Sequence, residues 1–194
     1  VWLHYRDTPF LHIFYIPRKF TERAHQMYLA DIEDWRARFG EFAGVEINDD
    51  ALRQSIQAYN RGWELLQQLQ DLRKREYPPI TGAETLEVVK ASMRLPRELF
   101  NELMEQLLDE INRTGREIKK RTRLMILGSI LTNSTWIESI ESLDAVVVTD
   151  ELCTGTRYFW EQVDTSLPPM EALARHYFNR PPCARFQPSA RRFS

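Results

Sequence analysis

The stretch that decides the fold is Arg123–Tyr158, with the sequence RLMILGSILTNSTWIESIESLDAVVVTDELCTGTRY. It contains two short apolar runs, Leu124–Leu127 and Ala145–Val148, and the second is rich in β-branched residues. Runs of this length and composition are typical of buried strands. Between them, Asn133 or Ser134 can cap a short helix. The expected apolar face of that helix is Ile137, Ile140 and Leu143.

Two buried strands joined by one helix form a right-handed βαβ unit, so the sequence predicts that these two strands are parallel. The carboxyl ends of parallel strands meet at one edge of a sheet, which brings Gly128-Ser129 close to Thr149-Asp150-Glu151. Open α/β sheets bind ligands at that edge. If the chain has a site, we expect it there.

The composition is that of an ordinary globular chain. Its 194 residues are enough for one large domain or parts of two. A net charge of -2 gives no general argument for a nucleic-acid or membrane partner, and no apolar run is long enough to span a bilayer. Cys153 and Cys183 are the only cysteines and form no CxxC pair, which suits a reducing, cytoplasmic setting. The chain begins with Val1 rather than Met, and we expect it to be part of something longer.

Upstream of the βαβ unit, the pattern predicts one strand and then only helices. The strand is Phe10–Ile16, ended by Pro17, and residues 18 to about 115 follow as a helical layer packed on itself. The expected signals of helix ends are Thr21, Gly44, the capping-box pair Thr81 and Glu84, Pro96 and Gly115. The expected apolar faces are Ala24, Met27, Tyr28, Ile32, Trp35 and Phe39; Leu52, Ile56, Tyr59, Trp63, Leu66 and Leu69; Leu86, Val89 and Met93; and Leu99, Leu103, Leu107 and Ile111.

Two basic segments flank the central stretch. The run Arg116–Arg123 before the first strand is typical of a solvated turn. After the second loop, Pro169 starts a helix with Leu173 and Tyr177 on one face. From Arg175 onward the chain has five arginines and no acid. Such a tail can face a phosphate-bearing ligand or an acidic partner, or it can be the frayed edge of a fragment, and we favour the second interpretation.

Candidate chemistry read from the residues alone is thin. Gly128-Ser129 falls far short of a Gly-rich phosphate loop, and the four histidines lack ligand spacing. Asp150, Glu151 and Cys153 follow a strand, where side chains can point into a crevice. The alternative is a polar turn in which Gly155 supplies positive φ and Cys153 fills space. Arg157 in the same loop can pair with Asp150 or bind an anionic ligand.

Four motifs together carry a family resemblance. They are ITGAE from Ile80, LMILGSILTN from Leu124, DAVVVTDELCTGTRYF from Asp144 and ALARHYFNRPPC from Ala172. In this order and at these separations, over nearly all of the chain, they resemble the 2-hydroxyacyl-CoA dehydratase (D component) and benzoyl-CoA reductase family. Each motif is short, so the resemblance rests on their order and spacing.

The resemblance implies two α/β domains of the doubly wound, Rossmann-like class with a helical layer, and a pair of related subunits. It also implies a 4Fe–4S cluster held by three cysteines in each subunit, and a separate ATP-hydrolysing activator that injects one electron. The reduced enzyme would form a ketyl radical on an acyl-CoA thioester, followed by loss of water, or would reduce a benzoyl ring.

On this resemblance the chain would be a fragment. Residues 1–17 would hold the last strand of a truncated N-terminal domain, 18–122 the helical middle and 123–194 the first part of the C-terminal α/β domain. Ser129 and Asn133 would line the crevice from the first loop, and Asp150, Glu151, Cys153 and Arg157 from the second. Cys153 is expected first as a site-lining residue and only second as a cluster ligand, because most ligands would lie outside the chain. The fragment alone is expected to be inactive and to bind no cofactor.

Two interpretations of other classes stay open. The chain can belong to a non-catalytic scaffold or binding subunit that keeps the fold without the cluster. It can also be an unrelated doubly wound domain that binds a nucleotide or a sugar. The sequence on either side of the chain would discriminate the enzyme from the scaffold, since cluster cysteines there favour the enzyme.

Overall fold

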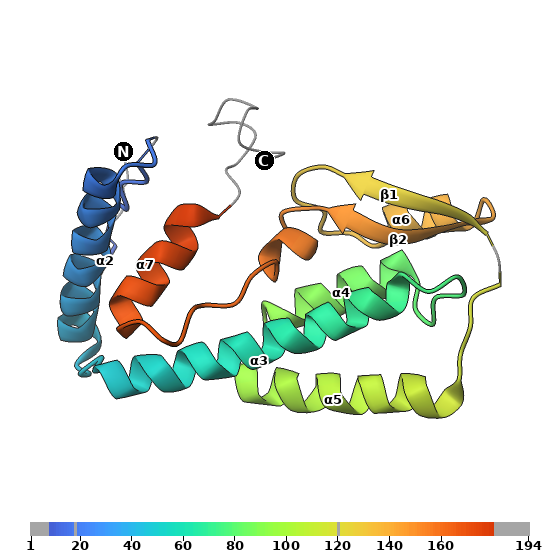
Figure 1. The fold of residues 1–194 in the computed structure, drawn as a ribbon, viewed down its shortest axis with the longest axis horizontal. Helices are drawn as coiled ribbons and strands as arrows, with labels where there is room; N and C mark the ends of the chain where they lie inside the picture. The colour runs from blue at the N-terminus through green and yellow to red at the C-terminus, as the bar shows by residue number, and fades with distance from the viewer. Residues whose placement is uncertain (1–7, 18, 120, 181–194) are drawn as a thin grey trace. The chain divides into compact units, whose positions relative to one another are not determined.

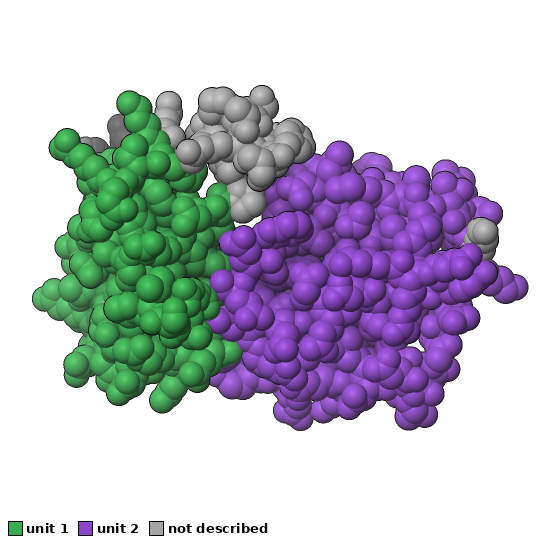
Figure 2. All heavy atoms as spheres, in the orientation of Figure 1, with its two compact units in different colours: residues 1–57, 163–194 green, residues 58–162 purple. Residues whose placement is uncertain are grey.

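The computed structural model describes residues 8–17, 19–119 and 121–180, and the chain divides into two compact units. One unit takes the residues up to 57 and from 163 onward, and the other takes residues 58–162 (Figure 2). No helix in the described ranges is long and apolar enough to cross a membrane. The expected division at residues 17 and 122 refers to the domains of a longer protein and stays a prediction.

The first unit is built on the pairing of α2 (Glu22–Ala43) with α7 (Pro169–Asn179), and it also holds the start of α3 (Asp49–Arg73). The Thr21 side chain caps α2 and Gly44 ends it at φ 66°, as predicted. Phe178 on α7 packs against Phe20, His25 and Tyr28. Because α7 lies along this side, α2 buries Ala24 and His25, whereas Met27 is 63% exposed, contrary to the predicted face. On α7, Tyr177 of the predicted face is also exposed, and Ala172, Ala174 and His176 are buried instead.

The strand predicted at Phe10–Ile16 is wrong, since residues 8–17 form no strand. A strand needs a neighbour to complete its ladder of hydrogen bonds, and the two strands of the described sheet both lie in the other unit. The segment is held by side chains instead. The Phe10 ring packs on the rings of Phe39 and Phe42, and His12 Nε2 lies 3.3 Å from Asp31 Oδ1.

The second unit contains most of α3, a two-stranded sheet and the helices around it (Figure 1). The sheet pairs β1 with β2 in parallel, with α6 as the crossover, so the predicted βαβ unit is confirmed. The fold is thus α/β, while the doubly wound sheet stays a prediction. The elements are α4 (Gly82–Ser92), α5 (Arg97–Thr114), β1 (Thr122–Leu127), α6 (Thr135–Glu141), β2 (Ala145–Glu151) and the 3-10 helix η1 (Thr156–Tyr158).

The ITGAE motif forms the start of α4. Thr81 Oγ1 accepts a hydrogen bond from Glu84 N, and the Glu84 carboxylate accepts one from Thr81 N, which confirms the capping box. Burial raises the pKa of Glu84, but hydrogen bonds from Arg116 and Thr81 outweigh burial and leave the pKa below its ordinary value. A Cβ on Gly82 would lie 2.5 Å from Val147 Cβ, so only glycine lets α4 approach β2 this closely.

One hydrophobic cluster of this unit lies between α4, α6 and one face of the sheet. Its fully buried members are Ala83, Leu86, Ile137 and Val147, with Leu124, Ile126 and Leu131 packed against them. The other face of β1 is open, because Met125 and Leu127 are 54% and 69% exposed. The expectation of two buried strands therefore holds for β2 but not for β1. No described element covers that face of β1.

Two helices bury a different stripe from the predicted one. α5 buries Phe100, Met104, Leu108 and Ile111, while Leu99 and Leu103 are 44% and 45% exposed. Both stripes have helical spacing, so periodicity alone could not choose between them. α6 buries Ile137 and Glu141, whereas Ile140 is 37% exposed and Leu143, which lies beyond the end of the helix, is 80% exposed. α3 ends at Arg73, and Gly115 ends α5 at φ 59° as predicted.

Both strands are longer than the apolar runs. β2 continues through Glu151, so Thr149, Asp150 and Glu151 belong to the strand and not to the loop after it. The register contains one irregularity: Leu124 lies opposite Val147, but Met125 lies opposite Thr149. Val148 is therefore an extra residue in β2, a β-bulge just before the two acidic residues.

Candidate functional site

The loops that follow β1 and β2 lie side by side at the edge where both strands end (Figure 1). Gly128 N donates to Glu151 O at 3.4 Å, and Cys153 N donates to Ser129 O at 3.1 Å. Thr154 Oγ1 accepts from Leu131 N at 3.2 Å and donates to Leu131 O at 3.0 Å. The predicted meeting of the two loops at one sheet edge is thus confirmed.

Asp150 holds the loop after β2 in place through hydrogen bonds. Its Oδ1 accepts hydrogen bonds from Leu152 N at 3.3 Å and Thr156 N at 2.9 Å, and the Thr156 hydroxyl donates to the Asp150 carbonyl oxygen. A Cβ on Gly155 would lie 1.9 Å from Oδ1, so the carboxylate occupies the space that any other residue would need. With its side chain only 10% exposed, Asp150 is placed to hold the loop.

The other oxygen of Asp150 faces Arg73, a buried cation from the last turn of α3. Arg73 Nη1 lies 3.3 Å from Asp150 Oδ2 and 2.6 Å from Gln70 Oε1, and Nη2 donates to Val147 O at 3.0 Å. Burial lowers the pKa of Arg73, and the nearby charge of Asp150 opposes that shift. Because Arg73 is 1% exposed, removal of Asp150 would leave a buried charge without its carboxylate.

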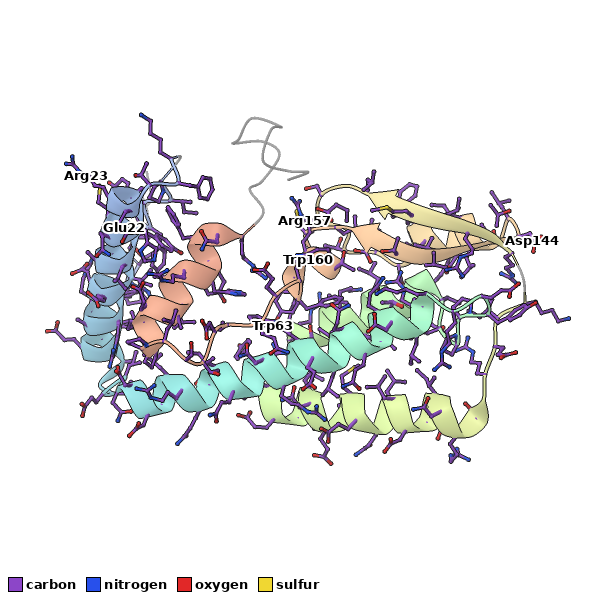
Figure 3. The ribbon with its side chains drawn as sticks, viewed as in Figure 1. Glu22, Arg23, Trp63, Asp144, Arg157 and Trp160 are labelled. Carbon is purple, nitrogen blue, oxygen red and sulfur yellow. The ribbon has the colours of Figure 1, made fainter. Side chains whose placement is uncertain are left out.

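The other polar candidates are Glu151 at the end of β2 and Cys153 and Arg157 in the loop that follows it. Arg157 Nε lies 2.9 Å from Glu151 Oε1, and Arg157 Nη1 donates to Cys153 Sγ at 3.7 Å. The Cys153 thiol is free and exposed. Figure 3 shows Arg157 and Trp160 beyond the ends of the strands, with Asp144 at the opposite end of the sheet. The Arg157 side chain is 15% exposed, and Trp160 is 61% exposed.

The two candidates of the first loop differ in their surroundings. Ser129 is exposed, and its carbonyl oxygen joins the loops as described above. Asn133 Oδ1 accepts from Thr135 N at 3.0 Å and so supports the first turn of α6, while Ser134 makes no capping hydrogen bond with its side chain. The structure therefore brings four candidates together at the ends of the strands, namely Ser129, Glu151, Cys153 and Arg157. Asp150 is largely buried next to them, and Asn133 supports the start of α6.

A second buried arginine connects the loop to the helical layer. Arg97 Nη2 donates to Tyr158 Oη at 2.8 Å and to Ser92 O at 2.8 Å. Its guanidinium lies 4.1 Å from the centre of the Tyr59 ring and 5.2 Å from that of Phe100. The loop that carries the candidate residues is thus anchored at Arg73 and again at Arg97.

Sequence reasoning missed Arg73, Arg97 and Glu141. The Glu141 carboxylate is 6% exposed and accepts from Gly82 N, Ala83 N and Val147 N at 2.8, 3.3 and 3.0 Å. A signal existed for two of them. Arg73 follows Leu69 and Glu141 follows Ile137 by four residues, so each continues the buried stripe of its helix.

Neither of two cavities in the second unit lies at the exposed surface of the two loops. A cavity of about 360 Å³ opens between α4 and α6 and is lined by Thr81, Glu84, Glu87, Arg121, Glu138 and Ser142 among others. A second, of about 10 Å³, lies between Arg73, Asp150, Gly155 and the core. Its volume is that of about one water molecule. Neither is lined by Cys153 or Arg157.

Comparison with known proteins identifies the family. The chain is 29% identical over 149 residues to a benzoyl-CoA reductase subunit of Thauera aromatica. The matched region covers 76% of this chain and 39% of that protein. It is 23% identical over 137 residues to the beta subunit of lactoyl-CoA dehydratase of Anaerotignum propionicum, covering 70% of this chain and 36% of that protein. The chain therefore spans less than half the length of these relatives. The family model described as 2-hydroxyglutaryl-CoA dehydratase, D-component, matches residues 1–194, and the chain belongs to that family.

Proposed function

We propose that this chain supplies the helical region and the first two strands of a doubly wound domain to a subunit of an acyl-CoA-processing enzyme. The reaction would be that of a 2-hydroxyacyl-CoA dehydratase or of a benzoyl-CoA reductase. The observation that carries the proposal is the family match along residues 1–194. The relatives named above, one a reductase subunit and one a dehydratase subunit, support both branches.

In this proposal the acyl-CoA thioester lies against the joined loops. Ser129, Glu151, Cys153 and Arg157 face it from the surface, while Asp150 and Asn133 fix the loops that carry them. The Arg157 guanidinium is bound to Glu151, and an anionic group of the substrate would take the place of that carboxylate. Guanidinium groups bind carboxylate and phosphate oxygens through paired, charge-assisted hydrogen bonds.

The family resemblance implies a 4Fe–4S cluster, but the described residues do not fit one. Such a cluster takes thiolates at three or four corners. Within the described ranges, no group of three or more His, Cys, Asp or Glu side chains could hold a metal ion, and Cys153 is the free cysteine there. Cys183 lies outside the described residues. In the proposal, residues outside this chain supply most of the cluster ligands, and Cys153 contributes at most one. This chain therefore carries no redox step by itself.

The partners belong to the same proposal. They are an acyl-CoA substrate, a homologous second subunit and a separate ATP-dependent activator that delivers the electron for ketyl-radical chemistry. Neither a nucleic acid nor a membrane is among them, and a free thiol at Cys153 suits a cytoplasmic location. The two relatives are themselves called subunits, which supports the second subunit.

A scaffold subunit without a cluster is the second candidate. Because most cluster ligands would lie outside this chain, Cys153 as the free cysteine among the described residues is compatible with both candidates. Both candidates share the fold and the thioester surface, so they differ only in the donor set of the complete subunit.

The thioester surface is tested by equilibrium binding. Isothermal titration of the protein with benzoyl-CoA, lactoyl-CoA and free coenzyme A should detect binding of a thioester. Arg157→Gln should weaken that binding by about ten- to a hundredfold, since a charge-assisted hydrogen bond contributes about 1.5–3 kcal/mol. The matched control is Arg113→Gln, which removes an exposed arginine of α5 that pairs with Glu110. Absence of thioester binding, or equal losses in the two variants, would rule the surface out.

A further inference from the structure

The smaller cavity of the second unit, of about 10 Å³, is enclosed by the chain itself. Its walls come from the end of α3, from α4, α6 and β2, and from the loop after β2, and they include Arg73, Thr85, Val89 and Asp150. All of the lining residues are buried except Asp150, whose side chain is 10% exposed. Closure of this cavity therefore needs no further segment of a longer protein.

One nitrogen of the buried Arg73 guanidinium lacks an acceptor. Nη1 donates to Gln70 Oε1 and lies 3.3 Å from Asp150 Oδ2, and Nη2 donates to Val147 O. The third nitrogen, Nε, is also buried, and no described residue accepts a hydrogen bond from it. Leaving a buried N–H of a charged group unsatisfied costs more free energy than ordering one water molecule beside it. Arg73 Nε therefore favours a bound acceptor.

Two hydrogen-bond acceptors line the same cavity as Arg73. Thr85 Oγ1 donates its proton to the carbonyl oxygen of Thr81 at 2.8 Å, and its lone pairs can accept from another donor. The Asp150 carboxylate is the second acceptor. Buried waters typically make about three hydrogen bonds to polar groups, whereas cavities that stay dry are apolar. A volume of about one water, surrounded by one donor and two acceptors, is of the hydrated kind.

We propose that this cavity is the binding site of one ordered water molecule, which accepts from Arg73 Nε and donates to Thr85 Oγ1 and to the Asp150 carboxylate. The water completes the hydrogen bonds of the buried Arg73–Asp150 pair and connects it to α4. Because Asp150 also holds the loop after β2, the water is part of the support of that loop. It positions the candidate residues and does not itself lie at their surface.

Oxygen-17 magnetic relaxation dispersion of the solvent tests the water directly, because it counts long-lived internal waters and does not respond to side-chain hydroxyl groups. Val89→Ile adds a methyl group at the cavity wall, so this variant should hold about one long-lived water fewer than wild type. Val163→Ile is the matched control, since it enlarges a buried valine that does not line the cavity. Its count should equal that of wild type. An equal count in folded Val89→Ile would overturn the proposal.

A pair of variants at Thr85 tests the partners of the water and decides the question if Val89→Ile does not fold. Thr85→Val keeps the shape of the side chain but removes the acceptor, so it should lose the water, whereas Thr85→Ser should retain it. Hydrogen exchange of the Leu152 and Thr156 amides, which donate to Asp150 Oδ1, should be about tenfold faster in Thr85→Val than in Thr85→Ser. Retention of the water in Thr85→Val, or equal exchange in the two variants, would contradict the proposed site.

Discussion

Replacement of Glu141 should destabilise this protein more than any exposed substitution on the same helix. The Glu141 carboxylate accepts three backbone N–H groups, two from the first turn of α4 and one from β2. In Glu141→Ala these three donors lose a charged acceptor at a buried position. The same substitution also removes the negative charge that the N-terminus of α4 favours.

The magnitude follows from the hydrogen bonds. Each bond to a charged group contributes about 1.5–3 kcal/mol, but water can reach some amides once the side chain is gone, so Glu141→Ala should lose about 3–5 kcal/mol. Glu141→Gln keeps one oxygen, which can still accept from Gly82 N and Val147 N, and its new amide faces Ala83 N–H. The loss should then be about 1–2 kcal/mol. A domain of ordinary stability has about 5–15 kcal/mol in total.

Urea unfolding followed by circular dichroism at 25 °C measures both losses. The control is Glu138→Ala, an exposed acid one turn earlier on α6, which should change the free energy of unfolding by less than about 0.5 kcal/mol. If Glu141→Ala costs less than about 1 kcal/mol, or no more than Glu138→Ala, the buried carboxylate does not join α4 to β2 as described.

Three further predictions concern the candidate site and α4. Gly155→Ala should cost about 1–3 kcal/mol in urea unfolding, because its Cβ would meet Asp150 Oδ1 at 1.9 Å, whereas Gly128→Ala, with its nearest atom at 3.4 Å, should be close to neutral. Glu84 has a lowered pKa, so its ionised form stabilises the fold above its unfolded pKa of about 4.5 and this gain is lost as the pH falls through the folded pKa. The melting temperature of wild type should thus exceed that of Glu84→Gln at pH 7 and approach it near pH 3, and a constant difference would contradict this. Anaerobic reconstitution with iron and sulfide should leave the chain colourless, and a brown species that is lost in Cys153→Ser would instead make Cys153 a ligand.

Local signals predicted the frame of the fold. The caps at Thr21 and Thr81 and the left-handed ends at Gly44 and Gly115 depend on residues within a few positions, so they could be read from the chain. The parallel pairing followed from two β-rich runs and the helix between them. Parallel pairing was enough to predict that the loops after the two strands meet at one end of the sheet.

The burial of Arg73 and Glu141 depends on long-range contacts, so it could not be predicted from the local sequence. Arg73 in the last turn of a helix resembles a solvated end, and it is buried because Asp150 and Val147, more than seventy residues later, supply its acceptors. Glu141 resembles a surface acid, and the amides of Gly82 and Ala83 hold it inside. In such cases a polar side chain at an apolar position is informative only when its partner is known.

The β-bulge at Val148 has an evolutionary consequence. Side chains alternate between the faces of a regular strand, so without a bulge Val147 and Asp150, three residues apart, would lie on opposite faces. With Val148 present, Asp150 shares the face of Ile126 and is buried, whereas Glu151 shares the face of exposed Leu127. Loss of the Val148 codon would restore regular alternation and keep Asp150 opposite Ile126 and Glu151 opposite Leu127. Descendants of this gene should therefore tolerate loss of Val148, provided that they keep the spacing from Thr149 to Glu151.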